Sequence, residues 1–141
     1  MLTIRILCHG TLKEPYLRDA CAEYVKRLGA YGRVEVLEAK DDGALASYIK
    51  TREGTFALCV EGEELTSPGF ARCLGEQIDR GVSTLSFVIG GSDGLPESTK
   101  ALCAERVSFS KMTFPHQLMR VILLEQIYRA MNINHNGKYH K

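Results

Sequence analysis

Three segments of this chain carry residue types that could do chemistry. The first, residues 85–94, is a run of bulky apolar residues that ends abruptly at Gly90, Gly91 and Gly94. Glycine allows positive φ and lets a ligand approach the main chain closely. A strand, a glycine loop and a helix start, which Pro96 indicates, form a common cofactor cradle at the carboxyl edge of a parallel sheet. A simple tight turn explains the glycines equally well.

The second segment, residues 109–117 with the sequence FSKMTFPHQ, places polar and soft side chains between an expected strand and the last helix. We expect the ends of this strand and of the glycine-edged strand to be adjacent and to face each other across a crevice, where open α/β sheets bind ligands. His116 is also explained as a first-turn residue that stabilises the start of the helix. The third segment is the tail, Asn136 to Lys141, which contains Tyr139 and His140. A frayed terminus is the alternative for this segment.

Several site classes lack their motif. A dinucleotide fingerprint needs glycine at Ile89 and an acidic residue about 20 positions further on, where Ser110 and Lys111 stand. No G-K-[ST] follows a glycine loop, and no serine lies in G-x-S-x-G. The four histidines lack metal-ligand spacing. These patterns argue against nicotinamide-dependent oxidoreductases, P-loop enzymes, serine hydrolases and a metal site.

Composition is that of one globular domain. The 141 residues are 45% hydrophobic and 25% charged. Five scattered cysteines without a C-x-x-C pair predict free thiols. No apolar run is long enough to span a membrane, and no secretory signal is visible, so we expect a cytoplasmic protein.

Charge is unevenly distributed although the net charge is only +1. Residues 100–141 carry seven Lys or Arg against two Glu, which gives +5 there and −4 over residues 1–99. This asymmetry is compatible with a polyanionic partner at one end of the molecule, and a solvated basic face accounts for it equally well.

Hydrophobic patterning predicts alternating strands and helices, and therefore an α/β domain with a mostly parallel sheet. Strands are expected at 2–8, 34–37, 56–60, 85–89 and 106–109, with a loop at 61–66. Helices are expected from Pro15 to Gly29, from Asp41 or Asp42 to 49, from the Ser67 cap to 81, at 96–105, and from the Thr113 cap to 131. Apolar residues cover most of the circumference of the last helix, which favours a subunit interface over burial within one chain.

The three segments, in their order and spacing, resemble the RlmH family of SPOUT-class RNA methyltransferases. The resemblance rests on FVIGGSDG at 87–94, SFSKMTFPHQLMRVILLEQIYRA at 108–130, and the terminal Tyr139-His140-Lys141. It implies a single domain over residues 1–141, with a carboxyl-terminal trefoil knot and cofactor pocket within about 85–135, that is active as a homodimer. The tail departs from the family's usual pattern, because Lys138 stands where proline is common.

The resemblance also implies an activity: transfer of a methyl group from S-adenosylmethionine to N3 of a pseudouridine in the helix 69 loop of 23S ribosomal RNA, on the assembled 70S ribosome. No metal is implied. The cofactor-binding positions carry over by motif to Leu58, Gly90, Phe109, Ser110, Lys111, Met112, Thr113 and Phe114. Two alternatives remain, a non-catalytic module that binds ribosomal RNA and a knotted methyltransferase that acts on transfer RNA.

The N3 proton must leave during such a transfer, so a base or a stabiliser of the developing anion is needed near the target. His140 is the best candidate base. Arg129 and Lys141 are candidates for holding phosphate or imide oxygen, and Tyr139 for packing on the target base. Because the tail follows a helix expected at a dimer interface, we expect an active site that is shared between subunits.

Overall fold

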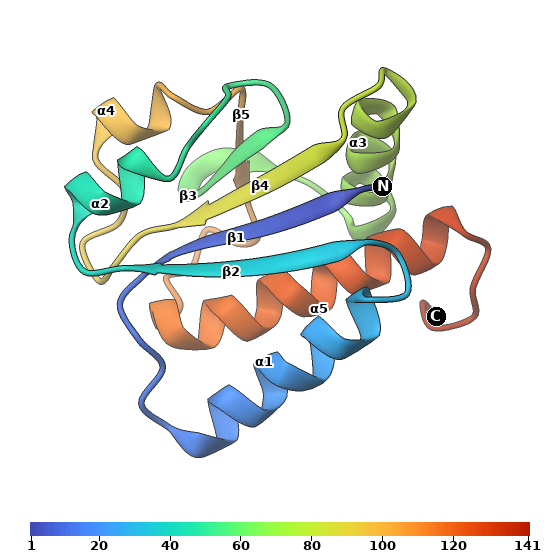
Figure 1. The fold of residues 1–141 in the computed structure, drawn as a ribbon, viewed down its shortest axis with the longest axis horizontal. Helices are drawn as coiled ribbons and strands as arrows, with labels where there is room; N and C mark the ends of the chain where they lie inside the picture. The colour runs from blue at the N-terminus through green and yellow to red at the C-terminus, as the bar shows by residue number, and fades with distance from the viewer.

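Five parallel strands and five helices alternate along the chain in the computed structural model, which describes residues 1–141 (Figure 1). The elements are β1 Thr3–His9, α1 Pro15–Leu28, β2 Arg33–Ala39, α2 Asp42–Ser47, β3 Thr55–Glu64, α3 Ser67–Asp79, β4 Thr84–Ile89, α4 Glu97–Lys100, β5 Glu105–Ser108 and α5 His116–Asn134. The sheet order is β2-β1-β4-β3-β5, and every pairing is parallel. The α/β class and the parallel sheet are confirmed.

Helices cover both faces of the sheet. α1, α3 and α5 lie on one face, and α2 and α4 lie on the other (Figure 1). Because successive side chains of a strand point to opposite faces, Ile4 and Ile6 of β1 enter the larger core while Leu7 enters the smaller one. β4 is central and buried on both sides, with the ring of Phe87 stacked 5.1 Å from that of Phe56. This central strand carries the glycine loop.

The prediction of a loop at residues 61–66 is wrong, because β3 continues to Glu64. A bulge lies between Leu58 and Glu63, both of which pair with Val107 of β5. A Cβ at Gly62 would lie 2.7 Å from the Val107 carbonyl carbon, so glycine allows this close approach. The charged residues of the extension lie mostly exposed, where a strand tolerates them.

Several helix boundaries also differ from expectation: α2 and α3 end two residues early, at Ser47 and Asp79, and α5 continues past 131 to Asn134. Thr66, and not Ser67, caps α3, since its hydroxyl accepts from the Gly69 N–H at 3.0 Å. α5 begins at His116 after Pro115, with no side-chain cap from Thr113. The helix expected at 96–105 is a single turn, Glu97–Lys100. After this turn, the Ala104 N–H donates a hydrogen bond to the Arg52 carbonyl. This bond connects the segment just before β5 to the segment just before β3.

α5 runs between α1 and α3 and packs on both. Leu123, Leu124 and Ile127 are fully buried on its inner side. Leu118 remains exposed and Ile122 half-buried on the opposite side. The circumference of apolar residues is therefore only partly explained by packing within one chain.

Candidate cofactor pocket and carboxyl-terminal cluster

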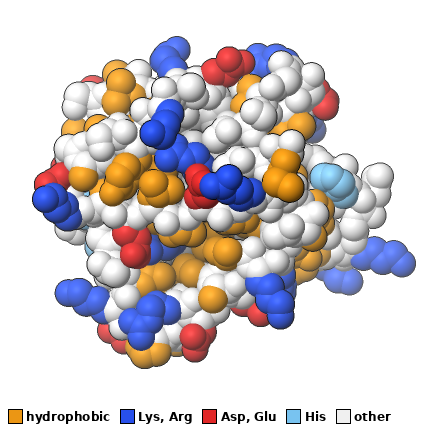
Figure 2. All heavy atoms as spheres, in the orientation of Figure 1, with side chains coloured by type: hydrophobic (Ala, Val, Ile, Leu, Met, Phe, Trp, Pro, Cys, Tyr) orange, Lys and Arg blue, Asp and Glu red, His pale blue; other side chains and the backbone are white.

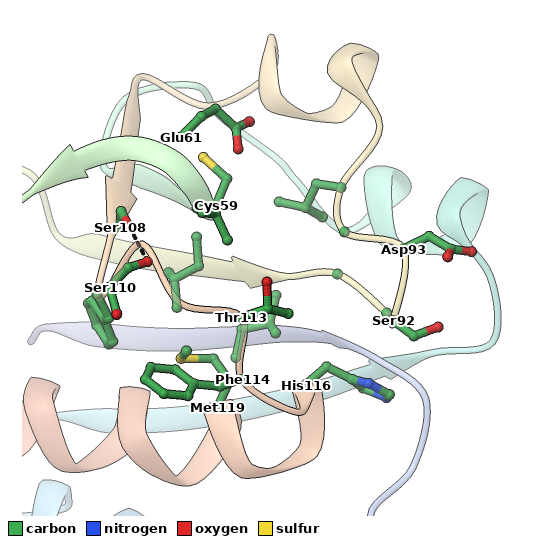
Figure 3. Close-up of a pocket in the computed structure, with 18 of the residues that line it drawn as sticks. Cys59, Glu61, Ser92, Asp93, Ser108, Ser110, Thr113, Phe114, His116 and Met119 are labelled. Atoms are coloured by element: carbon green, nitrogen blue, oxygen red, sulfur yellow. Dashed lines mark hydrogen bonds between the residues drawn. The ribbon is translucent and has the colours of Figure 1, made fainter.

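A pocket of about 590 Å³ lies beyond the carboxyl ends of β3, β4 and β5. Figure 3 shows side chains from four segments around it: Cys59 and Glu61 of β3, Ser92 and Asp93 after β4, Ser108, Ser110, Thr113 and Phe114 at and after β5, and His116 and Met119 of α5. Its volume is in the range of small-molecule sites, and its position is where open α/β sheets bind ligands. The strand ends are not adjacent as expected, because β3 lies between β4 and β5.

The glycine loop folds tightly on itself. Gly91 and Gly94 form an isolated bridge, and the Gly94 N–H donates to the Gly91 carbonyl at 3.0 Å. A Cβ at Gly90 would lie 2.6 Å from the Gly94 carbonyl carbon and 2.9 Å from the Leu95 nitrogen. Gly94 has φ +79°, in the region that favours glycine. The glycines are therefore needed for the shape of the pocket wall.

Seven of the eight expected cofactor positions line this pocket: Leu58, Gly90, Phe109, Ser110, Met112, Thr113 and Phe114. Lys111 does not line it, because its side chain is exposed and its Nζ lies 3.8 Å from a carboxylate oxygen of Glu64. The sequence therefore predicted which segments form the pocket but not the direction of every side chain.

The loop after β5 is held by its own serines. The Ser108 hydroxyl donates to the Ser110 carbonyl at 2.8 Å, and the Ser110 hydroxyl accepts from the Met112 N–H at 3.0 Å. The Phe109 ring packs edge-on against Phe70 of α3, with centroids 5.6 Å apart. Behind this loop is a second cavity of about 280 Å³, which shares Val107, Ser108, Phe109 and Phe114 with the first pocket.

Several lining residues were not anticipated. Glu61 forms an ion pair with Lys100, and this partner holds the pKa of the Glu61 carboxyl below its usual range. Burial, followed by the nearby charges of His9 and Arg120, lowers the pKa of His116. His116 is therefore neutral at pH 7 at the pocket wall. No motif indicated Glu61, since its partner lies 39 residues further along the chain.

The tail is folded back against α5 rather than frayed. The Tyr139 N–H donates to the Asn132 side chain at 3.1 Å, and its hydroxyl donates to Glu125 Oε2 at 2.8 Å. Arg129 donates to the same carboxylate oxygen, and its Nη1 lies 2.9 Å from His140 Nδ1. Burial, with hydrogen bonds to Tyr24 and Glu125, raises the pKa of Tyr139. Lys141 is exposed.

Glu125 is the residue of this cluster that sequence reasoning missed. Its spacing of four from Arg129 on one helix was the available signal. Gly137 also matters, because a Cβ there would clash with the Asn132 side chain. The structure thus brings together Arg129, Tyr139 and His140.

The pocket and the tail cluster lie at opposite ends of α5. In Figure 1, the start of α5 and the carboxyl ends of the strands are at the left, and the chain terminus is at the right. Thirteen residues separate His116 from Arg129, which corresponds to about 20 Å along a helix. One chain therefore does not bring the candidate cofactor residues and the candidate catalytic residues together.

No group of three or more His, Cys, Asp or Glu side chains is arranged to hold a metal ion. None of the helices combines the length and apolar character that a membrane crossing requires. All five cysteines are free thiols, as predicted, with Cys59 and Cys73 only half-buried.

Comparison with known proteins gives relatives over the whole chain. Proteins named ribosomal RNA large subunit methyltransferase H from Bifidobacterium animalis subsp. lactis, Bacillus cereus and Oenococcus oeni are 46%, 43% and 41% identical. The alignments cover 99–100% of this chain and 100% of each relative.

The fold also resembles that of a probable methylase family protein from Haemophilus influenzae Rd KW20. The TM-score is 0.62 at 11% identity, and the match covers 98% of this chain and 70% of the other. Residues 2–140 match the family described as "Predicted SPOUT methyltransferase". The chain therefore belongs to the SPOUT methyltransferase family, as its motifs predicted.

Proposed function

We propose that this protein transfers a methyl group from S-adenosylmethionine to large-subunit ribosomal RNA, at N3 of a pseudouridine in the helix 69 loop of 23S RNA. The observation that carries the proposal is the pocket at the ends of β3, β4 and β5, lined by motif residues and found in a chain whose full-length relatives are named as large-subunit ribosomal RNA methyltransferases. The ribosome substrate makes the cytoplasm the expected location.

The pocket residues suit S-adenosylmethionine. Leu58, Ile89 and Phe114 offer apolar surface for an adenine ring, and the glycine loop exposes backbone groups beside it. Asp93 contributes a carboxylate to the lining, which complements the positive charge of the ligand's sulfonium and amino groups, whereas the Glu61 carboxylate is already paired with Lys100. The bound ligand supplies an activated methyl group. The chain's own residues would bind it and exclude water from it.

A homodimer accounts for the outer face of α5. On the outward side of α5, Leu118 is exposed, and Ile122, one helical turn further on, is half-buried beside the second cavity. Figure 2 shows hydrophobic side chains on the surface where α5 meets α1. We expect Leu118→Arg to produce monomers in sedimentation experiments at micromolar protein.

Leu102 provides the matched control for that experiment. Its exposure is similar, 43% against 40% for Leu118, but it follows α4 on the other side of the sheet. Leu102→Arg should therefore leave the dimer intact. A dimer that survives Leu118→Arg would contradict the proposed interface.

In the dimer, we assign Tyr139, His140, Lys141 and Arg129 of one subunit to the pocket of the other. The support is the separation of about 20 Å between the tail cluster and the pocket within one chain. Tyr139 and Lys141 would then contact the RNA, and His140 the reacting imide. The trefoil knot, expected within about residues 85–135, would hold the pocket loop at this junction.

The test is transfer of tritiated methyl groups to 70S ribosomes, free subunits, naked ribosomal RNA and transfer RNA in parallel. We expect labelling of assembled ribosomes, with the modified base mapped to N3 of a helix 69 pseudouridine. Labelling of transfer RNA alone would favour the alternative enzyme. Ribosome binding without any methyl transfer would favour a non-catalytic module.

A further inference from the structure

The hydrogen bond between Arg129 and His140 fixes where His140 carries its proton. Arg129 Nη1 lies 2.9 Å from His140 Nδ1. A guanidinium has only donors and keeps its charge, so Nδ1 must be the acceptor. A neutral imidazole that accepts at one nitrogen carries its hydrogen on the other. Neutral His140 is therefore the tautomer with the hydrogen on Nε2.

Glu125 holds the guanidinium in the orientation that this bond requires. Arg129 Nε and Nη2 donate to Glu125 Oε2 at 3.0 and 2.7 Å, which leaves Nη1 for the histidine. The Tyr139 hydroxyl donates to the same oxygen at 2.8 Å, and the Arg129 Cζ lies 4.8 Å from the centre of the Tyr139 ring. These contacts form a fixed chain from Glu125 through Arg129 to His140.

The same hydrogen bond occupies the only lone pair that the neutral ring offers. Nδ1 accepts from Arg129 and therefore cannot also accept a hydrogen bond from the substrate while this contact holds. Nε2 has no lone pair to offer while it carries the hydrogen. Nε2 makes no hydrogen bond within the chain, so its N–H is available to a substrate.

We propose that His140 acts as a hydrogen-bond donor to a carbonyl oxygen of the target base and not as the acceptor of the N3 proton. This inference rests on the proposed function and replaces the role of base expected from the sequence. Glu125 and Arg129 are positioning residues that select the donor tautomer. Lys141, next in the chain, adds positive charge on the side where the imide becomes anionic.

The reaction then balances without a protein base. The N3 proton passes to solvent water, and the resulting imide charge is shared with the carbonyl oxygens, where the His140 N–H stabilises it. The N3 electron pair forms the bond to the methyl carbon. The electrons of the carbon–sulfur bond return to sulfur, which leaves as the neutral thioether of S-adenosylhomocysteine.

Two substitutions of His140 separate a donor from a base. Gln has an amide N–H that can replace the Nε2–H donor, but it cannot accept a proton at neutral pH. We expect His140→Gln to retain turnover within about tenfold of wild type, while His140→Ala loses roughly 10²-fold to 10³-fold, as when an oxyanion donor is removed. Equal losses in the two variants would overturn the proposal.

Nuclear magnetic resonance of the nitrogen-15-labelled full chain provides a readout that does not depend on activity. Long-range proton–nitrogen correlations should show His140 as the neutral Nε2–H tautomer at about pH 7.5. A ring protonated on Nδ1 at that pH would overturn the proposal. Arg129→Lys removes the planar fork and should give mixed tautomers and a lower kcat at unchanged cofactor affinity.

His135 is the internal control for the spectrum, because its Nδ1 lies 2.8 Å from the Met131 carbonyl, an acceptor that demands the opposite tautomer. Failure of the proposed function itself would appear differently. Wild-type protein would then methylate no RNA, while the His140 spectrum would still report the Nε2–H form.

Discussion

Arg120 Nη1 lies 2.5 Å from Glu38 Oε2, and this pair connects α5 to the end of β2 beneath the loop that follows β1. Arg120 is 3% exposed and also donates to the Gly10 carbonyl at 3.0 Å, while its Nε lacks a partner. Burial of a charged group whose Nε–H has no acceptor costs desolvation free energy. The pair positions the first turns of α5, and with them His116 and Met119 of the pocket wall.

Replacement of Arg120 by Met should therefore destabilise the protein. The change leaves Glu38 and the Gly10 carbonyl without their donor, and because Glu38 is partly exposed we expect a loss on the order of 2 kcal/mol, below that of a fully buried pair. Urea unfolding measures it as a lower midpoint with an unchanged slope. Arg27→Met, which removes an exposed pair with Glu23, should change stability much less than Arg120→Met does. Equal effects of the two substitutions would contradict the structural role of Arg120.

Gly90→Ala tests the shape of the cofactor pocket. Steric exclusion of the ligand by a larger side chain is the simplest expectation from the sequence, but the structure shows that even a Cβ would first meet the backbone of Gly94 and Leu95. The loop must then open, so we expect calorimetry to show at least about a tenfold loss of S-adenosylmethionine affinity. Gly43→Ala is the control, because a Cβ there has only an ordinary 3.5 Å contact with Asp41. Unchanged affinity in folded Gly90→Ala protein would remove the glycine loop from the site.

Buried thiols should make stability fall in alkaline solution. Burial raises the pKa of Cys8 to about 12 and that of Cys103 to about 11. In the unfolded chain these thiols ionise near pH 8.5, so above that pH the unfolded state binds fewer protons than the native state. Stability contributed by the protonated thiols is thus present below about pH 8.5 and is lost as pH rises through the folded values.

Denaturation series at about pH 8, 9 and 10 check this effect through variants. Cys8→Ala should lower stability at every pH, since Cys8 is buried, but its stability should decline less steeply with pH than that of wild type. The half-buried Cys73 is the comparison, and Cys73→Ala should decline more nearly as wild type does. If the stabilities of wild type and Cys8→Ala declined in parallel with pH, the raised pKa of Cys8 would not contribute to the alkaline loss of stability.

The sequence pattern predicted correctly those elements whose formation depends on neighbouring residues in the chain. The run at 85–89 ends at three glycines because the loop after β4 needs them, and the first helix was predicted with the correct start and with its end at Gly29, which caps it after Leu28. β3 was predicted too short, because Glu61, Glu63 and Glu64 are typical of a loop. Their strand conformation depends on pairing with β5, more than 40 residues away.

The site was predicted in its segments but not in its arrangement. Strand order places β3 between β4 and β5, and no periodicity carries that information. The contact of Arg129 with His140 depends on a turn at Asn136, which has φ 60°, and on the fit of Gly137 against Asn132. Sequence identified Tyr139 and His140 as chemically notable. Only the folded tail shows that Glu125 and Arg129 orient them.

The central claim is that the pocket of one subunit works with the tail of the other, and mixed dimers test it most directly. One chain lacks residues 139–141 and keeps its pocket, and the other carries Gly90→Val and keeps its tail. Each homodimer should be inactive in methyl transfer to ribosomes. A one-to-one mixture should recover about one quarter of wild-type activity, because half of the dimers are mixed and each has one complete site. Inactive mixtures of chains that demonstrably form mixed dimers would contradict a shared site and would require the tail to act in its own subunit.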